Sequence, residues 1–219
     1  MNIKLLIQLL IMPGLAIAFT EQDAINQISN QRFEVSKEQL DKNKDMDKQI
    51  AEKGYVTANV GEEIRYLKNL IKKTLHLKSK NFNVESDIEK DIASIKLDFS
   101  YKSVIKGTTG YVPQGAYSES GWSGLKEMFL DLTMGACYFS VFHLPKNGYS
   151  PTIDHKKFIN GKDTDFTVKG NANEGYVYTL EWFEERYFRT LECAQKDESE
   201  RIMDNMISLA QKIDKESFG

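Results

Sequence analysis

The sequence is poor in the residues that most often carry out catalysis. It contains three histidines, His76, His143 and His155, with no HExxH pattern and no closely spaced pair, so a zinc site would need ligands from distant segments. It has no glycine-rich phosphate loop, and Ser123 lacks the glycine two residues later that a nucleophile elbow requires. These absences argue against the common serine and zinc hydrolases, and no cofactor is expected.

Cysteine is also scarce. The two cysteines, Cys137 and Cys193, both lie in strand-like segments. In an exported protein such a pair is expected to form a disulfide bond. The bond would close a segment of 193 − 137 = 56 residues and stabilise the fold by about 4 kcal/mol. A catalytic pair of Cys137 and His143 is disfavoured, because six positions along a strand separate two side chains by roughly 20 Å.

Long hydrophobic runs are confined to the N-terminus. Residues 1–20, MNIKLLIQLLIMPGLAIAFT, contain one lysine, an apolar stretch, a Pro13-Gly14 break and small residues that end at Ala18. This order is typical of a secretory signal peptide, and the break leaves too few apolar residues for a membrane-spanning helix, which needs about 20. The sequence therefore predicts a signal peptide at 1–18 with cleavage after Ala18. The mature protein of 219 − 18 = 201 residues is expected to be soluble, periplasmic or secreted, with no transmembrane segment.

The charge of the mature chain is nearly balanced. Without Lys4 of the signal peptide, 29 − 1 = 28 basic residues stand against 32 acidic ones, a formal charge of −4. A chain without a basic surplus is not expected to bind nucleic acid. The mature chain also lacks an Asn-x-Ser/Thr sequon, which favours a protein of the bacterial cell envelope over a eukaryotic secreted one.

Hydrophobic periodicity predicts an α+β fold, with an antiparallel sheet of about four to five strands flanked by helices. Residues 19–53 are expected to form a polar helical arm, and residues 54–219 a single domain. Within this domain, helical spacing of apolar residues predicts helices at 61–75, 125–132 and 197–213. Strand patterns occur at 95–106, 136–144, 166–169, 176–183 and 186–193, and residues 107–124 are expected to form a glycine-rich loop.

An oxygen-rich stretch in the arm has the spacing of a calcium-binding loop. Asp41, Asn43, Asp45 and Glu52 take positions 1, 3, 5 and 12 of such a loop. Met46 stands where the loop needs glycine for its sharp turn, and no second loop is present to pair with it. The alternative is a solvated helix of mixed charge, which the sequence favours, so no metal site is predicted.

One histidine has a setting suited to acid-base chemistry. His155 follows Asp154 in a predicted loop beyond Ser150-Pro151, and functional side chains are often found on loops. An alternative function is therefore an exported hydrolase that acts on an envelope substrate through a site centred on His155, with Asp154 as its partner.

Aromatic residues are concentrated in the predicted loop at 107–124. Tyr111, Tyr117 and Trp122 stand among glycines; they can form a platform for a sugar ring or a partner's side chain, or else fold back over the sheet as a lid. Because no catalytic constellation is recognisable, the sequence favours an exported, non-catalytic binding protein of the bacterial envelope with a protein or glycan partner. A further alternative is a structural subunit of a cell-surface or secretion assembly, docked through the arm at 19–53.

Overall fold

The computed structural model describes residues 37–78, 92–144, 156–184 and 186–218. Residues 46–219 form one compact unit; of the other unit, residues 1–45, the structure describes 37–45. The predicted signal peptide, much of the predicted arm, and both Asp154 and His155 lie outside the described residues. The described end of the arm is helical and forms α2 (Lys37–Lys53).

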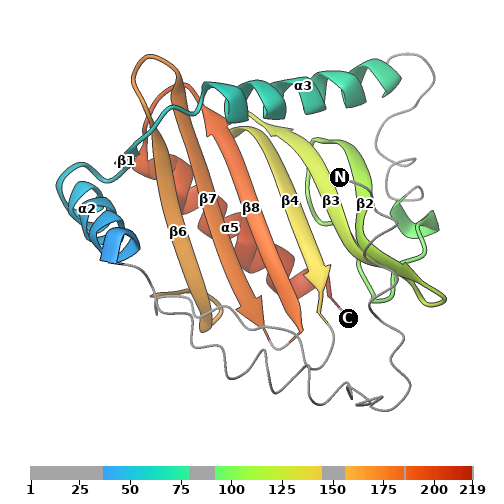
Figure 1. The fold of residues 1–219 in the computed structure, drawn as a ribbon. Helices are drawn as coiled ribbons and strands as arrows, with labels where there is room; N and C mark the ends of the chain where they lie inside the picture. The colour runs from blue at the N-terminus through green and yellow to red at the C-terminus, as the bar shows by residue number, and fades with distance from the viewer. Residues whose placement is uncertain (1–36, 79–91, 145–155, 185, 219) are drawn as a thin grey trace, which may run out of the picture. The chain divides into compact units, whose positions relative to one another are not determined.

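A mixed sheet of eight strands forms the centre of the unit at 46–219 (Figure 1). The strand order is β1-β6-β7-β8-β4-β3-β2, and β5 pairs with β6. Neighbouring strands are antiparallel except for β1 and β6, which are parallel. The α+β class is confirmed, but the sheet is larger than the four to five strands predicted. Its strands are β1 (Val56–Thr57), β2 (Thr108–Ser118), β3 (Gly121–Asp131), β4 (Gly135–His143), β5 (Lys156–Ile159), β6 (Lys162–Asn171), β7 (Gly175–Glu184) and β8 (Tyr187–Gln195).

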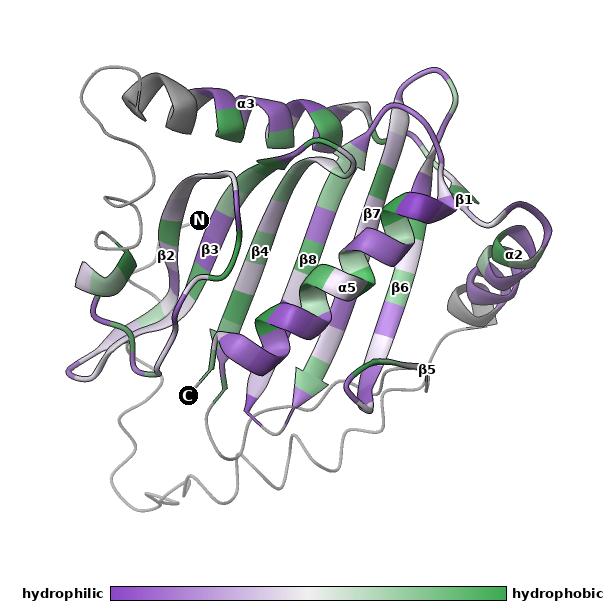
Figure 2. Cartoon of the chain, turned by 180° about the vertical axis from the view of Figure 1, so that it is seen from behind, coloured by the Kyte–Doolittle hydropathy of each residue, from purple (hydrophilic) through white to green (hydrophobic). Residues whose placement is uncertain are grey.

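Two helices cover opposite faces of the sheet (Figures 1 and 2). α3 (Gly61–Lys78) crosses one face near the strand ends, and α5 (Glu200–Glu216) crosses the other face obliquely. The helices predicted at 61–75 and 197–213 are thus confirmed, since ends commonly shift by a few residues. None of the helices in the described part of the chain combines the length and hydrophobicity that crossing a bilayer requires. α3 buries Ile64, Leu67 and Ile71, and α5 buries Ile202, Met206, Ala210 and Ile213.

The larger hydrophobic core lies between the sheet and α5. It contains aromatic side chains from the central strands, among them Phe139, Tyr178 and Trp182, which are almost fully buried. Burial of one such side chain stabilises the fold by about 1.5–3 kcal/mol. A smaller core under α3 joins Leu67 to Val177 and other side chains of the opposite face. The central strands are therefore covered on both faces, which explains why the segment predicted as a strand at 136–144 is apolar at both alternating sets of positions.

The hairpin of β2 and β3 is the largest departure from the sequence prediction. The predicted loop at 107–124 and helix at 125–132 both belong to these two strands. The helix prediction is wrong because β3 is buried on both faces. Leu125 and Phe129 pack in the larger core, while Met128 packs with Ile71 of α3. Apolar residues on both faces of a strand reproduce the spacing of a helical stripe, so periodicity alone does not separate the two.

The segment at 95–106 consists mainly of bends and irregular backbone, and it is not a strand of the sheet as predicted. Leu97 forms a single isolated bridge with Trp122. Tyr101 and Ile105 pack against the larger core, while Lys102 and Lys106 are exposed. The alternation of apolar and polar residues therefore reflects packing of one side onto the sheet surface, without the ladder of hydrogen bonds that defines a strand.

Candidate functional site

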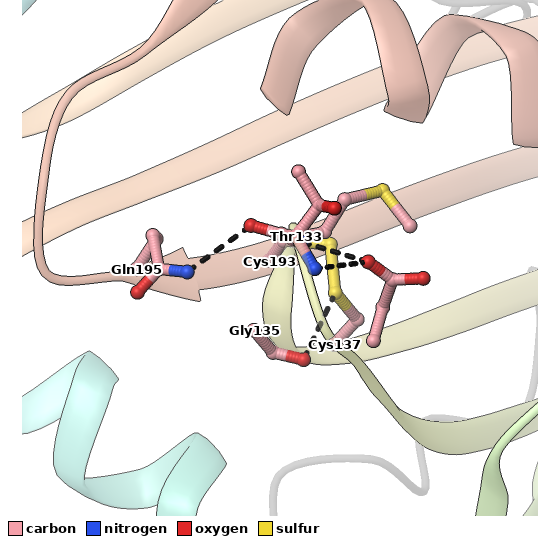
Figure 3. Close-up of a disulfide and its surroundings, with 7 residues drawn as sticks. Thr133, Gly135, Cys137, Cys193 and Gln195 are labelled. Carbon is pink, nitrogen blue, oxygen red and sulfur yellow. Dashed lines mark hydrogen bonds between the residues drawn. A yellow bond between two sulfur atoms is a disulfide. The ribbon is translucent and has the colours of Figure 1, made fainter. Parts of the chain in front are cut away.

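The two cysteines form a disulfide bond inside the larger core (Figure 3). Cys137 on β4 and Cys193 on β8 are directly opposed, with their Cα atoms 4.1 Å apart, and both side chains are fully buried. Beside the bond, the Gln195 side chain donates to the carbonyl of Thr133 at 3.1 Å and ties the turn from β3 to β4 to the end of β8. The predicted disulfide is confirmed, and neither thiol is free to act as a nucleophile.

The end of the β2–β3 hairpin carries two aromatic side chains, Tyr117 and Trp122, which we call the aromatic tip. Their ring centroids lie 5.2 Å apart with the planes inclined at 58°. Tyr117 is 62% exposed and Trp122 is half-buried. Tyr111 lies six positions back along β2 and packs toward the larger core. The structure therefore brings together two of the three predicted contact residues and separates the third.

Backbone contacts with the segment at 96–98 hold the aromatic tip in place. The N–H of Trp122 donates to the carbonyl of Lys96 at 2.8 Å, and the carbonyl of Trp122 accepts from the N–H of Asp98 at 3.0 Å. Gly121 permits this approach: its φ is +128°, and a Cβ there would lie 2.4 Å from the Lys96 carbonyl oxygen. The aromatic pair thus stands on an ordered backbone, which reduces the conformational entropy lost on binding.

The residues predicted as weak calcium ligands lie on α2 and do not converge. Asp41 and Glu52 are 52 − 41 = 11 positions apart in one continuous helix, about 16 Å along its axis. Asn43 and Asp45 are exposed on the same helix. Within the described ranges, no group of three or more His, Cys, Asp or Glu side chains is arranged to hold a metal ion. The stretch is a helix of mixed charge, which is the alternative that the sequence favoured.

His143 forms a side-chain pair that the sequence pattern did not indicate. Its Nδ1 lies 3.0 Å from Oδ1 of Asp98, and its ring packs against Tyr187 and Phe99 with centroid distances of 5.1 and 5.9 Å. The partners are 45 residues apart in the chain, so no local motif links them. The pair anchors the segment around Asp98 to the end of β4. The predicted pair of Asp154 and His155 lies outside the described residues.

One carboxylate of β8 lies close enough to α3 to interact with Glu63 of that helix. Glu192 on β8 lies opposite Tyr138 of β4 and Thr179 of β7. Burial raises the pKa of Glu192, and the nearby Glu63 of α3 raises it further, while hydrogen bonds from the hydroxyls of Tyr138 and Thr179 lower it. Lys126 lies over the Tyr138 ring, with Nζ 4.0 Å from the centroid. The partners of Glu192 all come from within the fold, so its position alone does not indicate a ligand.

A buried ionic cluster joins the C-terminal half of α5 to the strands beneath it. Arg189, which is 1% exposed, lies 3.6 Å from Asp214 and 3.3 Å from Glu184. The ammonium group of Lys162 lies 2.6 Å from Asp214. Burial alone would raise the pKa of Asp214, but hydrogen bonds from Lys162 and Asn160 and the positive charges outweigh it and hold the pKa below its ordinary value. Two cations and two carboxylates balance here, which indicates a structural attachment of α5.

Comparisons with known proteins identify no family for this chain. No family model, no curated protein and no solved structure matches it. The candidate sites therefore depend on the geometry of the chain itself. The sequence predicted binding contacts at Tyr111, Tyr117 and Trp122, and of these Tyr117, in the aromatic tip, is the exposed one.

Proposed function

We propose that this chain is an exported, non-catalytic binding protein that contacts a protein partner through the aromatic tip. The observation that carries the proposal is the exposure of Tyr117, 62%, on a hairpin whose backbone is held by the segment at 96–98. Large exposed aromatic side chains on an ordered backbone are the residues that most often dominate protein interfaces. The buried disulfide is compatible with export, because such bonds persist in oxidising compartments.

The relative orientation of the two rings favours a protein partner over a glycan. A planar platform would let one sugar ring stack across both side chains, but the rings of Tyr117 and Trp122 are inclined at 58°. They form a corner in which a partner's side chain contacts two surfaces at once, and edge-to-face contacts of this kind are favourable between aromatic rings.

The proposal is tested by capture from the native cell envelope with a matched pair of variants. Tyr117→Ala removes the exposed ring of the aromatic tip, and Tyr66→Ala removes a ring of α3 that is 57% exposed and distant in sequence from the tip. A protein retained by the wild type and by Tyr66→Ala, but not by Tyr117→Ala, is the expected partner. Its affinity, measured with purified components, should fall about 30-fold in Tyr117→Ala, the effect of a hot-spot residue worth about 2 kcal/mol.

Two results would contradict the proposed function. Equal affinity of Tyr117→Ala and the wild type for the purified partner would remove the aromatic tip from the interface. Capture of an envelope polysaccharide that depends on Tyr117, with no protein retained, would replace the protein partner with a glycan.

A further inference from the structure

A pocket of about 300 Å³ lies between α5, the turn from β3 to β4 and the segment at 104–106. Three of its lining side chains, Phe129, Met134 and Ile105, are apolar and largely buried, and the rest of the lining is mostly polar. Leu209 of α5 adds an apolar wall. The volume lies at the lower end of the range of about 300–1,000 Å³ typical of small-molecule sites, which are mostly apolar with a few polar groups.

A buried carboxylate fixes the segment that forms one wall of this pocket. Glu127 of β3 is fully buried and accepts hydrogen bonds from the hydroxyls of Tyr101, Ser103 and Thr108 at 2.7, 2.6 and 2.5 Å. These donors lie on both sides of Ile105 in the chain. Three charge-assisted hydrogen bonds of this kind are strong, so the wall at 104–106 is held in position before any ligand arrives.

The rim of the pocket is polar and carries more positive than negative charge. Lys106 and Lys212 are exposed at its edge, and Asn205 of α5 supplies an amide. Asp131 is the acidic residue of the lining, and its Oδ1 accepts from two backbone N–H groups of its own turn at 2.7 and 2.8 Å. The lining therefore contains two exposed lysines and one aspartate whose charge is already shared with hydrogen-bond donors. This arrangement favours an anion at the mouth and a hydrocarbon group on the floor.

We propose that this pocket binds a small monocarboxylate with an apolar tail. The carboxylate lies at the rim, where it receives hydrogen bonds from the ammonium groups of Lys212 and Lys106. The tail lies on Phe129, Met134 and Leu209. The pocket and the aromatic tip share no residues. The small-molecule ligand is therefore proposed in addition to the protein partner, and the two proposals are tested independently.

The experiment titrates the purified protein with 3-phenylpropionate and, in parallel, with the uncharged 3-phenylpropan-1-ol. Binding is followed by backbone amide chemical shifts in two-dimensional NMR. The expected result is saturable binding of the carboxylate, with shifts concentrated at 104–106, 129–134 and 205–212. The alcohol shares the apolar tail but lacks the charge, so it should bind several-fold more weakly. Raising the salt concentration should weaken the binding of the carboxylate but not that of the alcohol, because exposed charges are screened.

Two lysine variants of α5 separate a specific site from general attraction to positive charge. Lys212→Gln removes an ammonium group of the rim, whereas Lys215→Gln removes an exposed ammonium group of the same helix that does not line the pocket. Since an exposed ion pair contributes at most about 1 kcal/mol, Lys212→Gln should weaken 3-phenylpropionate about three- to fivefold. Lys215→Gln should match the wild type. Both lysines are exposed, so neither change is expected to unfold the protein.

Several outcomes would overturn this assignment. They are a titration that does not saturate, equal affinity for the carboxylate and the alcohol, and equal effects of Lys212→Gln and Lys215→Gln. Shifts confined to residues outside the pocket would overturn it as well. A variant with Leu209→Ala gives an independent check, because loss of an apolar contact should weaken both probes, whereas Lys212→Gln should weaken the anion.

Discussion

Cys137 and Cys193 face each other across β4 and β8, which are neighbours in the sheet although the cysteines are 56 residues apart in the chain. β4 ends the meander β2–β3–β4, and β8 ends the meander β5–β6–β7–β8. The disulfide therefore joins the two halves of the sheet at the strand pair where they meet. The loop of 56 residues that it closes is longer than the turns within either meander, so loss of chain entropy opposes this contact more than the hairpin contacts.

Removal of the disulfide should lower the free energy of unfolding by about 4 kcal/mol, because the unfolded chain regains the entropy of an open loop of 56 residues. The double variant Cys137→Ala and Cys193→Ala avoids burying unpaired hydroxyls in the core. Urea denaturation of this variant measures the change, and the reduced wild type serves as the control. A variant as stable as the oxidised wild type would show that the bond does not stabilise the fold.

Asp214→Asn should destabilise the fold by about 3–5 kcal/mol, because it leaves the buried guanidinium of Arg189 without a full counter-charge. Asp204→Asn, an exposed change on the same helix, is the control and should be near neutral. The folded-state pKa of Asp214 lies below its ordinary value of 3.8. Its contribution is therefore complete above that pH and is lost as the pH falls toward the folded-state pKa. Denaturation curves between pH 2 and 7 test this, and equal stability of the two variants at pH 7 would contradict it.

Glu192→Gln should change the pH dependence of the free energy of unfolding with the opposite sign to Asp214→Asn. Burial raises the folded-state pKa of Glu192 above its ordinary value of 4.5, so the folded protein holds this proton more tightly than the unfolded chain. The wild type therefore loses stability as the pH rises from 4.5 through the folded-state pKa, and then the loss is constant. The stability of Glu192→Gln relative to the wild type should increase over that range. A stability curve for Glu192→Gln that runs parallel to the wild-type curve over this pH range would refute the expectation.

Tyr117→Ala should leave the free energy of unfolding within about 0.5 kcal/mol of the wild type, because the ring is mostly exposed. Trp122→Ala should cost more than about 1 kcal/mol, since its side chain is half-buried. Thermal or urea denaturation distinguishes the two. This difference makes Tyr117→Ala the suitable variant for binding experiments. A large loss of stability in Tyr117→Ala would contradict this expectation and show that the Tyr117 side chain stabilises the fold.

Several elements were predictable because their signals are local. α3 and α5 each carry an apolar stripe at helical spacing, and the strands from β6 to β8 are separated by short polar or glycine-containing turns. The disulfide was predictable from the presence of two cysteines in strand-like segments of a chain with an export signal pattern. Each of these signals lies within one segment or in a simple count of residues.

Other features had no local signal. β3 was mistaken for a helix because α3 buries Met128 on one face while the larger core buries Phe129 on the other. The partners Asp98 and His143 are 45 residues apart. Of the three donors to Glu127, Tyr101 and Ser103 lie on a segment that the alternating pattern presented as a strand. The pocket near Lys212 is built from three separate parts of the chain, none of which has a binding motif.

By itself, the sequence determined which segments have one apolar face and where cysteines can pair, since side-chain spacing and the local turn residues decide these properties. The tertiary structure decided which strands are buried on both faces and which distant charged groups form pairs. It also decided that Tyr117 is exposed while Tyr111 packs inward. The physical reason is that burial and charge pairing depend on neighbours brought together by strand order, and the pairing of β4 with β8 is a long-range contact that no short stretch of residues specifies.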